Sequence, residues 1–347
     1  MNTRNLWVDY AKAIGIILVV YGHVVRGLLN AGILQDAEFH GLVDSVIYSF
    51  HMPLFFFLSG LFFYNSFVKR GTGGLLVNKI DTIVYPFLVW SLLQGSVEAL
   101  MSRYTNGGGV SFSEVLTVWE PRQQFWFLYA LFLVFCLAML AYRWAKPMAF
   151  FAVFAFGALV YLFQNAGPED FFFTFTAQNF VFFAFGVWFN NFKQAIEEQA
   201  GRVMLGSGLL FVVLEYWFHG LLGLVYTDRG LATLVLALNG IIFVCATCMV
   251  LAQRPMQWLL TLGTLSMPIY VMHVLSGSGA RIILSKGLHI NDGMLHIVAG
   301  CAFGILVPVA VAKFLEARHI NGLFEAPAWI SARRWLRPKA ETPRPAV

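Results

Sequence analysis

Charged residues are scarce in this chain: only 12% of its 347 residues are Asp, Glu, Lys or Arg. Soluble globular proteins contain about 25% of such residues. Hydrophobic residues make up 59% of the sequence, and Phe alone occurs 35 times. This balance excludes an ordinary soluble domain and indicates an integral membrane protein. Basic residues in short loops then explain the net charge of +5, and affinity for nucleic acids is not needed to explain it.

The motifs of several enzyme classes are also missing. The sequence contains no Walker-type glycine loop, no GxSxG and no dinucleotide-binding fingerprint. Its histidines form no HxxxH or HExxH pattern, so no metal site is predicted. Of the four cysteines, Cys245 and Cys248 form a CxxC without a neighbouring His or acidic residue. We interpret them as small packing residues.

Long apolar runs are abundant, and ten of them are long enough to cross a bilayer, which takes about 20 residues. They lie near residues 10–30, 44–66, 80–102, 124–143, 148–165, 171–190, 203–223, 231–252, 257–277 and 294–314. The sequence therefore predicts an all-α membrane protein, a polytopic bundle of about ten transmembrane helices within residues 1–318. A basic tail at 319–347 is expected to lie on the anionic inner leaflet. The first run is expected to be a span and not a cleaved signal peptide.

The distribution of Lys and Arg predicts the orientation. With the N-terminus inside, 17 of the 23 basic residues fall on the cytoplasmic side. The six others are Arg26, Arg103, Arg122, Arg229, Arg281 and Lys286. This bias predicts an N-in and C-in topology, which requires an even number of spans. The longest outer connection, residues 103–124, contains three consecutive glycines and is expected to be flexible.

The first apolar run carries ionisable side chains that contact with lipid does not explain. Lys12 and His23 are eleven residues apart, almost three helical turns, so they share one helix face. Asp9 lies about 40° from that line. A charge at membrane depth costs at least ~2.5 kcal/mol, so such residues usually face a bundle interior or a substrate path. The alternative is that Asp9 and Lys12 lie among the headgroups and His23 bonds a neighbouring helix.

Lys12 and His23 suit different tasks. A neutral His23 can accept a proton from a hydroxyl group and return it later. Lys12 lies about 16 Å away on the same face and suits an anionic ligand that enters from the cytoplasm. A phosphopantetheine arm has about that reach. A ligand whose charged end rests at Lys12 can therefore place a reactive end at His23.

Further polar side chains gather at the predicted depth of His23. His51 opens the second apolar run, Glu98 lies near the outer end of the third, and Glu215 and His219 share a face of the seventh. A cavity lined by these side chains would hold a polyol or sugar acceptor. The alternative is a set of unrelated interhelical hydrogen bonds and interfacial residues. Three other histidines are expected to be solvated in or beside outer loops: His40, His289 and His296.

Five short motifs follow one another along residues 9–273. They are Asp9-x-x-Lys12 with Gly22-His23, Phe50-His51-Met52-Pro53 with Ser59-Gly60, Lys79 with Tyr85-Pro86, Phe125-Trp126-Phe127-Leu128-Tyr129, and Gly263-x-x-Ser266 with Tyr270-x-x-His273. In this order they resemble the membrane-bound acyltransferase family 3. The most similar subgroup is that of the fucose 4-O-acetylase-like sugar O-acyltransferases of bacterial inner membranes.

The resemblance implies an activity. It implies a multi-pass protein of the bacterial inner membrane that takes an acyl group, usually acetyl, from acyl-coenzyme A. The acceptor would be a hydroxyl group of a cell-surface glycan or a lipid-linked sugar. It also implies that His23 is the catalytic residue, that Lys12 contacts the donor, and that Trp126 and His273 belong to the acceptor pocket. No metal is implied.

Two positions depart from the family pattern. The family usually has Arg where Lys12 stands, and Lys keeps the charge but loses the bidentate fork. The family also places more arginines before the proline of the third span, where this sequence has Asp81 and Thr82. The further candidates for the donor site are then Asp9, Lys69, Arg70 and Lys79.

Two other functions fit the same residues. A transporter or exporter of a small polar solute would use the intramembrane polar side chains as a relay. A catalytically inactive scaffold of a polysaccharide assembly complex would need none of them. Solute flux without release of coenzyme A would indicate the first, and an inert His23→Ala change would indicate the second.

Overall fold

The computed structural model describes residues 5–101, 111–320 and 322–336, and in these ranges all regular structure is helical, with no strand. The α-helices are α1 (Leu6–Asn30), α2 (Ala37–Tyr48), α3 (His51–Leu61), α4 (Phe63–Lys79), α5 (Tyr85–Leu100), α6 (Phe112–Val115), α7 (Trp126–Ala141), α8 (Phe150–Leu162), α9 (Phe171–Phe189), α10 (Lys193–Glu198), α11 (Ala200–Glu215), α12 (Leu231–Leu251), α13 (Gln257–Thr264), α14 (Ser266–Ile282) and α15 (Gly293–Ala317). The prediction of an all-α membrane bundle is confirmed.

Nine helices in the described ranges are long and apolar enough to cross a membrane. At the position of the predicted fifth span the structure has a shorter apolar helix, Pro147–Leu162. The orientation relative to the membrane stays a prediction. The glycines of the predicted flexible loop lie within residues 102–110, outside the described part of the chain.

The predicted ninth span, 257–277, is wrong in its boundaries. The chain forms the short helix α13 and then a separate long helix, Ser266–Gly287. Pro268 explains the break, because it has no N–H to bond the carbonyl of Thr264 and its ring would clash there. Pro268 is tolerated in the first turn of α14, where its N–H would be unpaired in any case.

The early spans also begin before their predicted edges. The second apolar helix covers Ala37–Leu61 with a break at Ser49 and Phe50, and the third covers Phe63–Leu100. A turn at Gly71, with φ 66°, divides α4 and requires the conformational freedom of glycine. From Gly71 the chain continues through a π-helical turn, η1 (Ile80–Val84), into α5.

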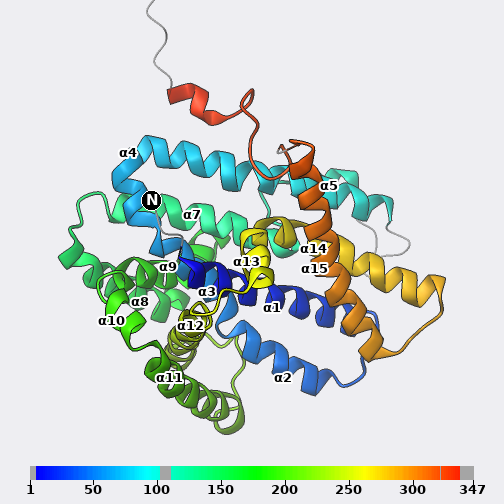
Figure 1. Cartoon of the computed structure of the whole chain (residues 1–347), viewed down its shortest axis with the longest axis horizontal. Helices are drawn as coiled ribbons and strands as arrows, with labels where there is room; N and C mark the ends of the chain where they lie inside the picture. The colour runs from blue at the N-terminus through cyan, green and yellow to red at the C-terminus, as the bar shows by residue number, and fades with distance from the viewer. Residues whose placement is uncertain (1–4, 102–110, 321, 337–347) are drawn as a thin grey trace, which may run out of the picture.

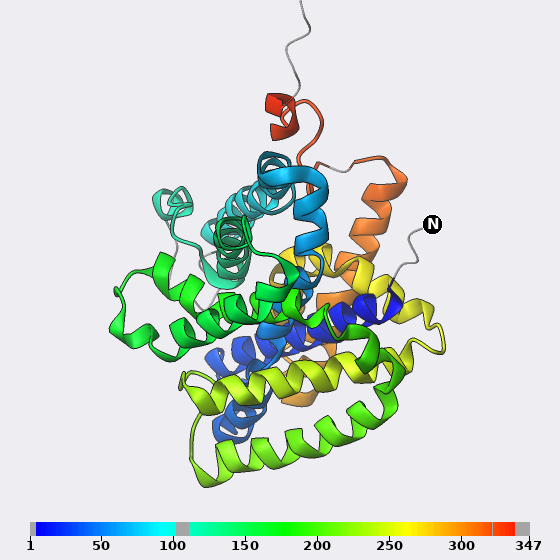
Figure 2. The same ribbon diagram turned by 90° about the vertical axis from the view of Figure 1, so that its left-hand side faces the viewer.

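Helix α1 runs through the middle of the molecule (Figure 1). It packs against α2, α3, α12, α13, α14 and α15, so helices from both halves of the chain contact it. Figure 2 shows α11 and α12 lying side by side at one edge of the bundle. Helix α11 exposes apolar residues such as Leu205 and Leu209, as a helix facing lipid does.

The crossing of α3 and α9 is a close backbone contact made possible by two glycines. A Cβ atom on Gly60 would overlap the backbone of Phe183, and one on Gly186 would overlap the backbone of Phe57. Small residues at such crossings let helix backbones approach, which replaces the missing hydrophobic force inside a membrane. Phe63 and Phe135 then pack edgewise or tilted around Phe183. The crossing fixes the position of α3, which lines one of the cavities described below.

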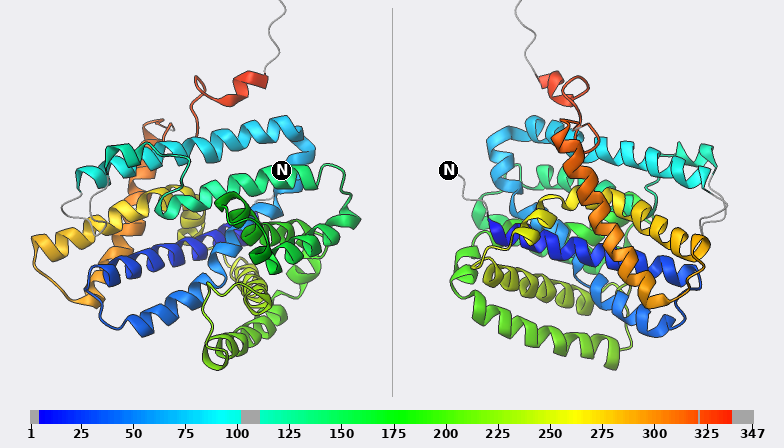
Figure 3. Two further views of the ribbon diagram at one scale, coloured as in Figure 1. Left: turned by 180° about the vertical axis from the view of Figure 1, so that it is seen from behind. Right: turned by 45° about the vertical axis from the view of Figure 1, so that its right-hand side comes forward.

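The chain after α15 returns to the helical bundle. Figure 3 shows it passing beside the long helix formed by α4 and α5. Residues 322–334 bond η1 and α5, so this part of the predicted tail is docked on the protein. Its contact with the inner leaflet stays a prediction. Residues 337–347 lie outside the described part of the chain.

Candidate functional site

Two cavities lie along one face of α1. The first, of about 870 Å³, is lined by His23 and His273, and we name it the histidine cavity. The second, of about 680 Å³, is lined by Lys12 and Lys79, and we name it the lysine cavity. Helix α1 contributes Lys12 and Val19 to the lysine cavity and His23 to the histidine cavity. The predicted face shared by Lys12 and His23 therefore borders both cavities.

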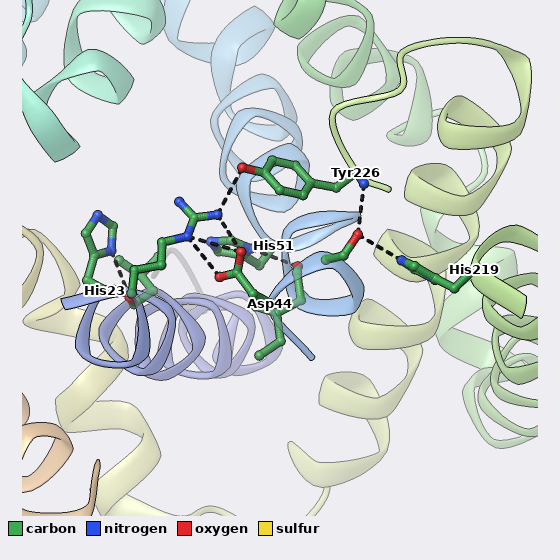
Figure 4. Close-up of polar contacts among 9 residues, drawn as sticks. His23, Asp44, His51, His219 and Tyr226 are labelled. Carbon is green, nitrogen blue, oxygen red and sulfur yellow. Dashed lines mark hydrogen bonds and ion pairs between the residues drawn. The ribbon is translucent and has the colours of Figure 1, made fainter. Parts of the chain in front are cut away.

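His23 lines the histidine cavity and contacts a residue that lines the lysine cavity. Its Nδ1 atom is 3.0 Å from the carbonyl oxygen of Val19, a residue that lines the lysine cavity. Because a carbonyl oxygen only accepts hydrogen bonds, this contact requires the proton on Nδ1. In the neutral ring Nε2 is then left without a proton and can act as an acceptor or a base. The contact is drawn in Figure 4.

His273 faces the same cavity from α14. Its ring packs edgewise against His23, with 4.8 Å between the ring centroids. Its Nδ1 donates to the carbonyl oxygen of Tyr270 at 2.7 Å. Its Nε2 is buried and has no hydrogen-bond partner within the described residues. A buried acceptor without a partner costs about 1–3 kcal/mol, so its presence beside a cavity points to a ligand that donates a hydrogen bond.

A wall that includes residues of α14 and of the start of α7 lies between the two cavities. Tyr270 lines the lysine cavity, and its hydroxyl group donates to the backbone carbonyl of Gln124, which lines the histidine cavity. The neighbours Trp126 and Phe127 likewise lie on different sides, Trp126 in the histidine cavity and Phe127 in the lysine cavity. These contacts place the linings of the two cavities next to each other.

Arg26, one helical turn after His23, is held rigidly in the histidine cavity. Its Nε and Nη2 atoms donate to the two carboxylate oxygens of Asp44 at 3.0 and 2.7 Å. Its guanidinium group lies 3.6 Å from the centre of the Tyr48 ring, a cation–π contact. It also donates to the hydroxyl oxygen of Tyr226 at 3.1 Å. The sequence analysis placed Arg26 only among the basic residues of the outer side, although its spacing from His23 puts it on nearly the same face.

Amide and carboxylate groups form the opposite wall of the histidine cavity. Gln124 donates to Gln94 at 2.6 Å, and Gln94 donates to Gln123 at 3.0 Å. Gln123 donates to Glu98 at 3.0 Å, and Arg122 forms an ion pair with Glu98 at 3.2 Å. Gln123 has φ 45°, which is uncommon for a residue other than glycine and occurs often at ligand-binding sites.

The three other predicted acceptor residues lie behind the cavity. His51 is fully buried, bonds the carbonyl of Ile47 at 2.8 Å and packs edgewise against Tyr48, which itself lines the cavity. Glu215 and His219 contact α2 and the turn that follows it: Ser49 donates to Glu215 at 3.0 Å, and His219 bonds Ser45 at 2.8 Å.

Tyr226 connects another part of this second layer to the cavity. Tyr226 donates its backbone N–H to Ser45 and receives a bond from Arg26, so it joins His219 to the Arg26–Asp44 pair (Figure 4). His296, expected in solvent, is instead buried and lines the cavity, because Asp292 caps α15 and places His296 in its first turn. His296 bonds the carbonyl of Ile290 at 2.8 Å.

The lysine cavity combines two cations with apolar walls. Lys12 forms an ion pair with Asp9 at 3.6 Å, so Asp9 acts through Lys12 and is not itself in the lining. The ammonium group of Lys79 lies 4.0 Å from the centre of the Phe135 ring. The other predicted donor contacts, Lys69 and Arg70, are exposed before the turn at Gly71 and line neither cavity. No metal-binding group of three or more His, Cys, Asp or Glu residues is found in the part of the chain that the structure covers.

Comparison with known proteins assigns a family. A family model described as an acyltransferase domain matches residues 5–313, nearly the whole helical bundle. The chain belongs to acyltransferase family 3. The resemblance found in the sequence motifs is thereby confirmed.

Two curated relatives of this acyltransferase family 3 member carry the name Nodulation protein NolL. The protein from Sinorhizobium fredii is 27% identical over 211 residues, 60% of this chain and 54% of the relative. The protein from Mesorhizobium japonicum is 28% identical over 136 residues, 39% of this chain and 35% of the relative. The chain thus spans about a third to a half of the length of these relatives. No solved structure matches.

Proposed function

We propose that this protein transfers an acyl group, specifically an acetyl group, from acyl-coenzyme A to a hydroxyl group of a cell-surface glycan or lipid-linked sugar. The donor occupies the lysine cavity, the acceptor occupies the histidine cavity, and His23 is the general base. One observation carries the proposal: a histidine of the polar cavity, whose neutral ring leaves Nε2 without a proton, bonds a residue that lines the cationic cavity. Membership of acyltransferase family 3 supports the reaction class.

The lining of the lysine cavity suits acyl-coenzyme A. Lys12 and Lys79 supply positive charge for phosphate groups. Leu58, Phe62 and Leu131 supply apolar surface for the pantetheine arm and the acyl group. Lys12 and His23 are about 16 Å apart along α1, a distance that the extended arm can span. The thioester carbon then lies at the wall beside His23.

The reaction follows from the position of Nε2. The acceptor hydroxyl oxygen attacks the thioester carbonyl carbon while His23 Nε2 takes the hydroxyl proton. A carbon–oxygen bond forms, the carbon–sulfur bond breaks, and the protonated His23 gives its proton to the departing sulfur. The products are an ester and free coenzyme A, and His23 returns to its neutral state. The Val19 carbonyl holds the ring and its tautomer throughout.

The histidine cavity suits a polyhydroxylated acceptor. Its amides, Glu98 and the Nε2 atom of His273 offer hydrogen-bond acceptors, and its arginines and amides offer donors. Trp126 offers an aromatic face on which a sugar ring can pack. Because hydroxyl groups both donate and accept, a sugar can satisfy this lining where a hydrocarbon cannot.

The location proposed is the bacterial inner membrane, with both termini inside. The bias of basic residues supports this orientation. Lys12 near the N-terminus and Phe324 near the C-terminus line one cavity, which fits an even number of crossings and a shorter tenth span at Pro147–Leu162.

Release of coenzyme A from acetyl-CoA tests the proposal without knowledge of the acceptor. The purified protein is incubated in detergent with acetyl-CoA, and free thiol is measured for the wild type, His23→Ala and the control His289→Ala, which changes an exposed histidine. We expect slow hydrolysis in the wild type and the control, and loss of release in His23→Ala. Equal release from His23→Ala would contradict the role of His23.

A strict need for the acceptor would suppress release in all three proteins. A titration with acetyl-CoA then decides: saturable binding supports a donor site, and its absence refutes acyl transfer from coenzyme A. Solute flux into proteoliposomes without thiol release would favour the transporter.

A further inference from the structure

The lysine cavity is completed by residues that lie beyond the family match. The match ends at residue 313. Phe324 and Glu325, from the segment that follows α15, line the cavity together with Lys12 and Lys79. We name residues 322–334 the C-terminal strap. The charge and shape of the cavity therefore depend in part on a segment that the family match does not include.

One buried carboxylate anchors the strap. Asp81, in the π-helical turn η1, is 2% exposed. Its carboxylate accepts hydrogen bonds from the hydroxyl group of Ser331 at 2.5 Å and the backbone N–H of Ala332 at 2.8 Å, and it lies 3.4 Å from Arg333. Asp81 stands where the family resemblance leads one to expect arginine, so this departure has a structural role.

Two aromatic residues of α5 hold the other end of the strap. The hydroxyl group of Tyr85 donates to the carbonyl of Gly322, and the indole N–H of Trp90 donates to the carbonyl of Leu323, both at 2.7 Å. The Phe324 ring stacks on Trp90 with 16° between the planes. Trp90 itself is buried, 4% exposed. These contacts fix Phe324 where it borders the cavity.

The strap is held at both ends by several contacts with η1 and α5. If it left, the Asp81 carboxylate would lose its hydrogen bonds from Ser331 and Ala332 and its ion pair with Arg333. The indole N–H of Trp90 would lose its acceptor as well. Opening would therefore cost several bonds at once.

We infer that the C-terminal strap is part of the binding site for the acyl donor, with Phe324 as an apolar wall and Glu325 as a carboxylate that limits the positive charge of the cavity. The inference rests on the proposed function, because it takes the lysine cavity as the donor site. The Glu325 carboxylate accepts a hydrogen bond from Arg333 at 2.8 Å, which orders the side chain of this lining residue. The phosphates of the donor meet two lysines and, beside them, this one carboxylate.

The two residues predict opposite effects on donor affinity. Phe324→Ala removes part of the wall and should weaken binding of acetyl-CoA about tenfold, which corresponds to ~1.4 kcal/mol. Glu325→Gln keeps the shape but removes a negative charge beside a polyanionic ligand. It should tighten binding about threefold at low salt, with a smaller gain at high salt. A merely damaged protein would not bind the donor more tightly.

The experiment is a titration of the purified full-length protein with acetyl-CoA, together with thiol release at saturating donor. Phe314→Ala is the matched control, because Phe314 lies at the end of α15 and is 58% exposed, outside the cavity. We expect weaker binding in Phe324→Ala, partial recovery in Phe324→Leu, and unchanged binding and release in Phe314→Ala.

The outcomes separate the inference from the proposed function. Affinity in Phe324→Ala within about twofold of the wild type, or an equal loss in Phe314→Ala, would overturn the inference alone. If Phe324→Ala does not fold, Glu325→Gln decides: tighter binding supports the inference, and unchanged or weaker binding overturns it. No binding of acetyl-CoA by the wild type would overturn the proposed function and the inference with it.

Discussion

Replacement of Gly60 by alanine tests the packing that places α3 beside the lysine cavity. The added Cβ would overlap the carbonyl oxygen of Phe183 and lie 2.8 Å from its carbonyl carbon, whereas ordinary contacts are 3.4–4 Å. Both obstacles are backbone atoms and cannot rotate away. Helices α3 and α9 must therefore separate by roughly 1 Å, which is an overpacking cost of about 1–3 kcal/mol.

The assay is thermal unfolding in detergent with Gly206→Ala as the matched control. Gly206 also lies in a helix, α11, but a Cβ there meets nothing within 4 Å. At ~2 °C per kcal/mol for a chain of this size, Gly60→Ala should lower the apparent Tm by about 2–6 °C. Gly206→Ala should leave it unchanged or raise it, because alanine favours the helix by ~0.5–1 kcal/mol. Equal Tm values for the two variants would refute the close crossing of α3 and α9.

Three further predictions concern the two cavities. Lys12→Ala should weaken acetyl-CoA binding roughly tenfold, whereas Lys69→Ala, which changes a residue outside the cavity, should leave the affinity unchanged. A titration measures both affinities, and equal values for the two variants would exclude Lys12 from the donor site. Asp44→Ala should lower the free energy of unfolding by about 1–3 kcal/mol. This is less than the ~3–5 kcal/mol for breaking a fully buried ion pair, because the Arg26 side chain is 34% exposed. Tm measurements test the loss, and the double variant with Arg26→Ala should recover part of it. His273→Phe removes a buried nitrogen without a partner and should keep or raise the Tm. It should leave acetyl-CoA affinity unchanged, because His273 lines the histidine cavity; weaker donor binding would contradict this placement.

The face of α1 could be predicted from the sequence because it depends only on helical periodicity. The eleven-residue spacing of Lys12 and His23 was enough to place both on one side, and the structure finds cavities along that side. Glu98, Trp126 and His273 were also placed in the region of the histidine cavity. Their roles in the acceptor pocket stay predictions.

The rotation of one helix against another could not be predicted. Glu215 and His219 share a helix face, but that face meets α2 and not the cavity. His51 lies one layer behind Tyr48. Arg26 was passed over because its partner Asp44 comes from a different helix, and sequence spacing alone does not reveal such a pair.

The docking of the C-terminal strap also lies beyond sequence patterns. Its basic residues indicate that the strap contacts a negatively charged partner. The anionic lipid leaflet and a buried carboxylate on the protein fit this pattern equally well. Only the fold brings Asp81 to within hydrogen-bond distance of residues 331 and 332. A pairing across 250 positions of the chain leaves no local signal.

The central claim is that His23 is the base between a donor cavity and an acceptor cavity. The most direct test compares His23→Gln with the wild type in two measurements on the same preparation, acetyl-CoA affinity and the rate of thiol release. Glutamine keeps polar bonding but cannot act as a base at neutral pH. The account predicts unchanged affinity and a release rate lower by about 10²–10⁴-fold. Release at the rate of the wild type, with the same affinity, would contradict it.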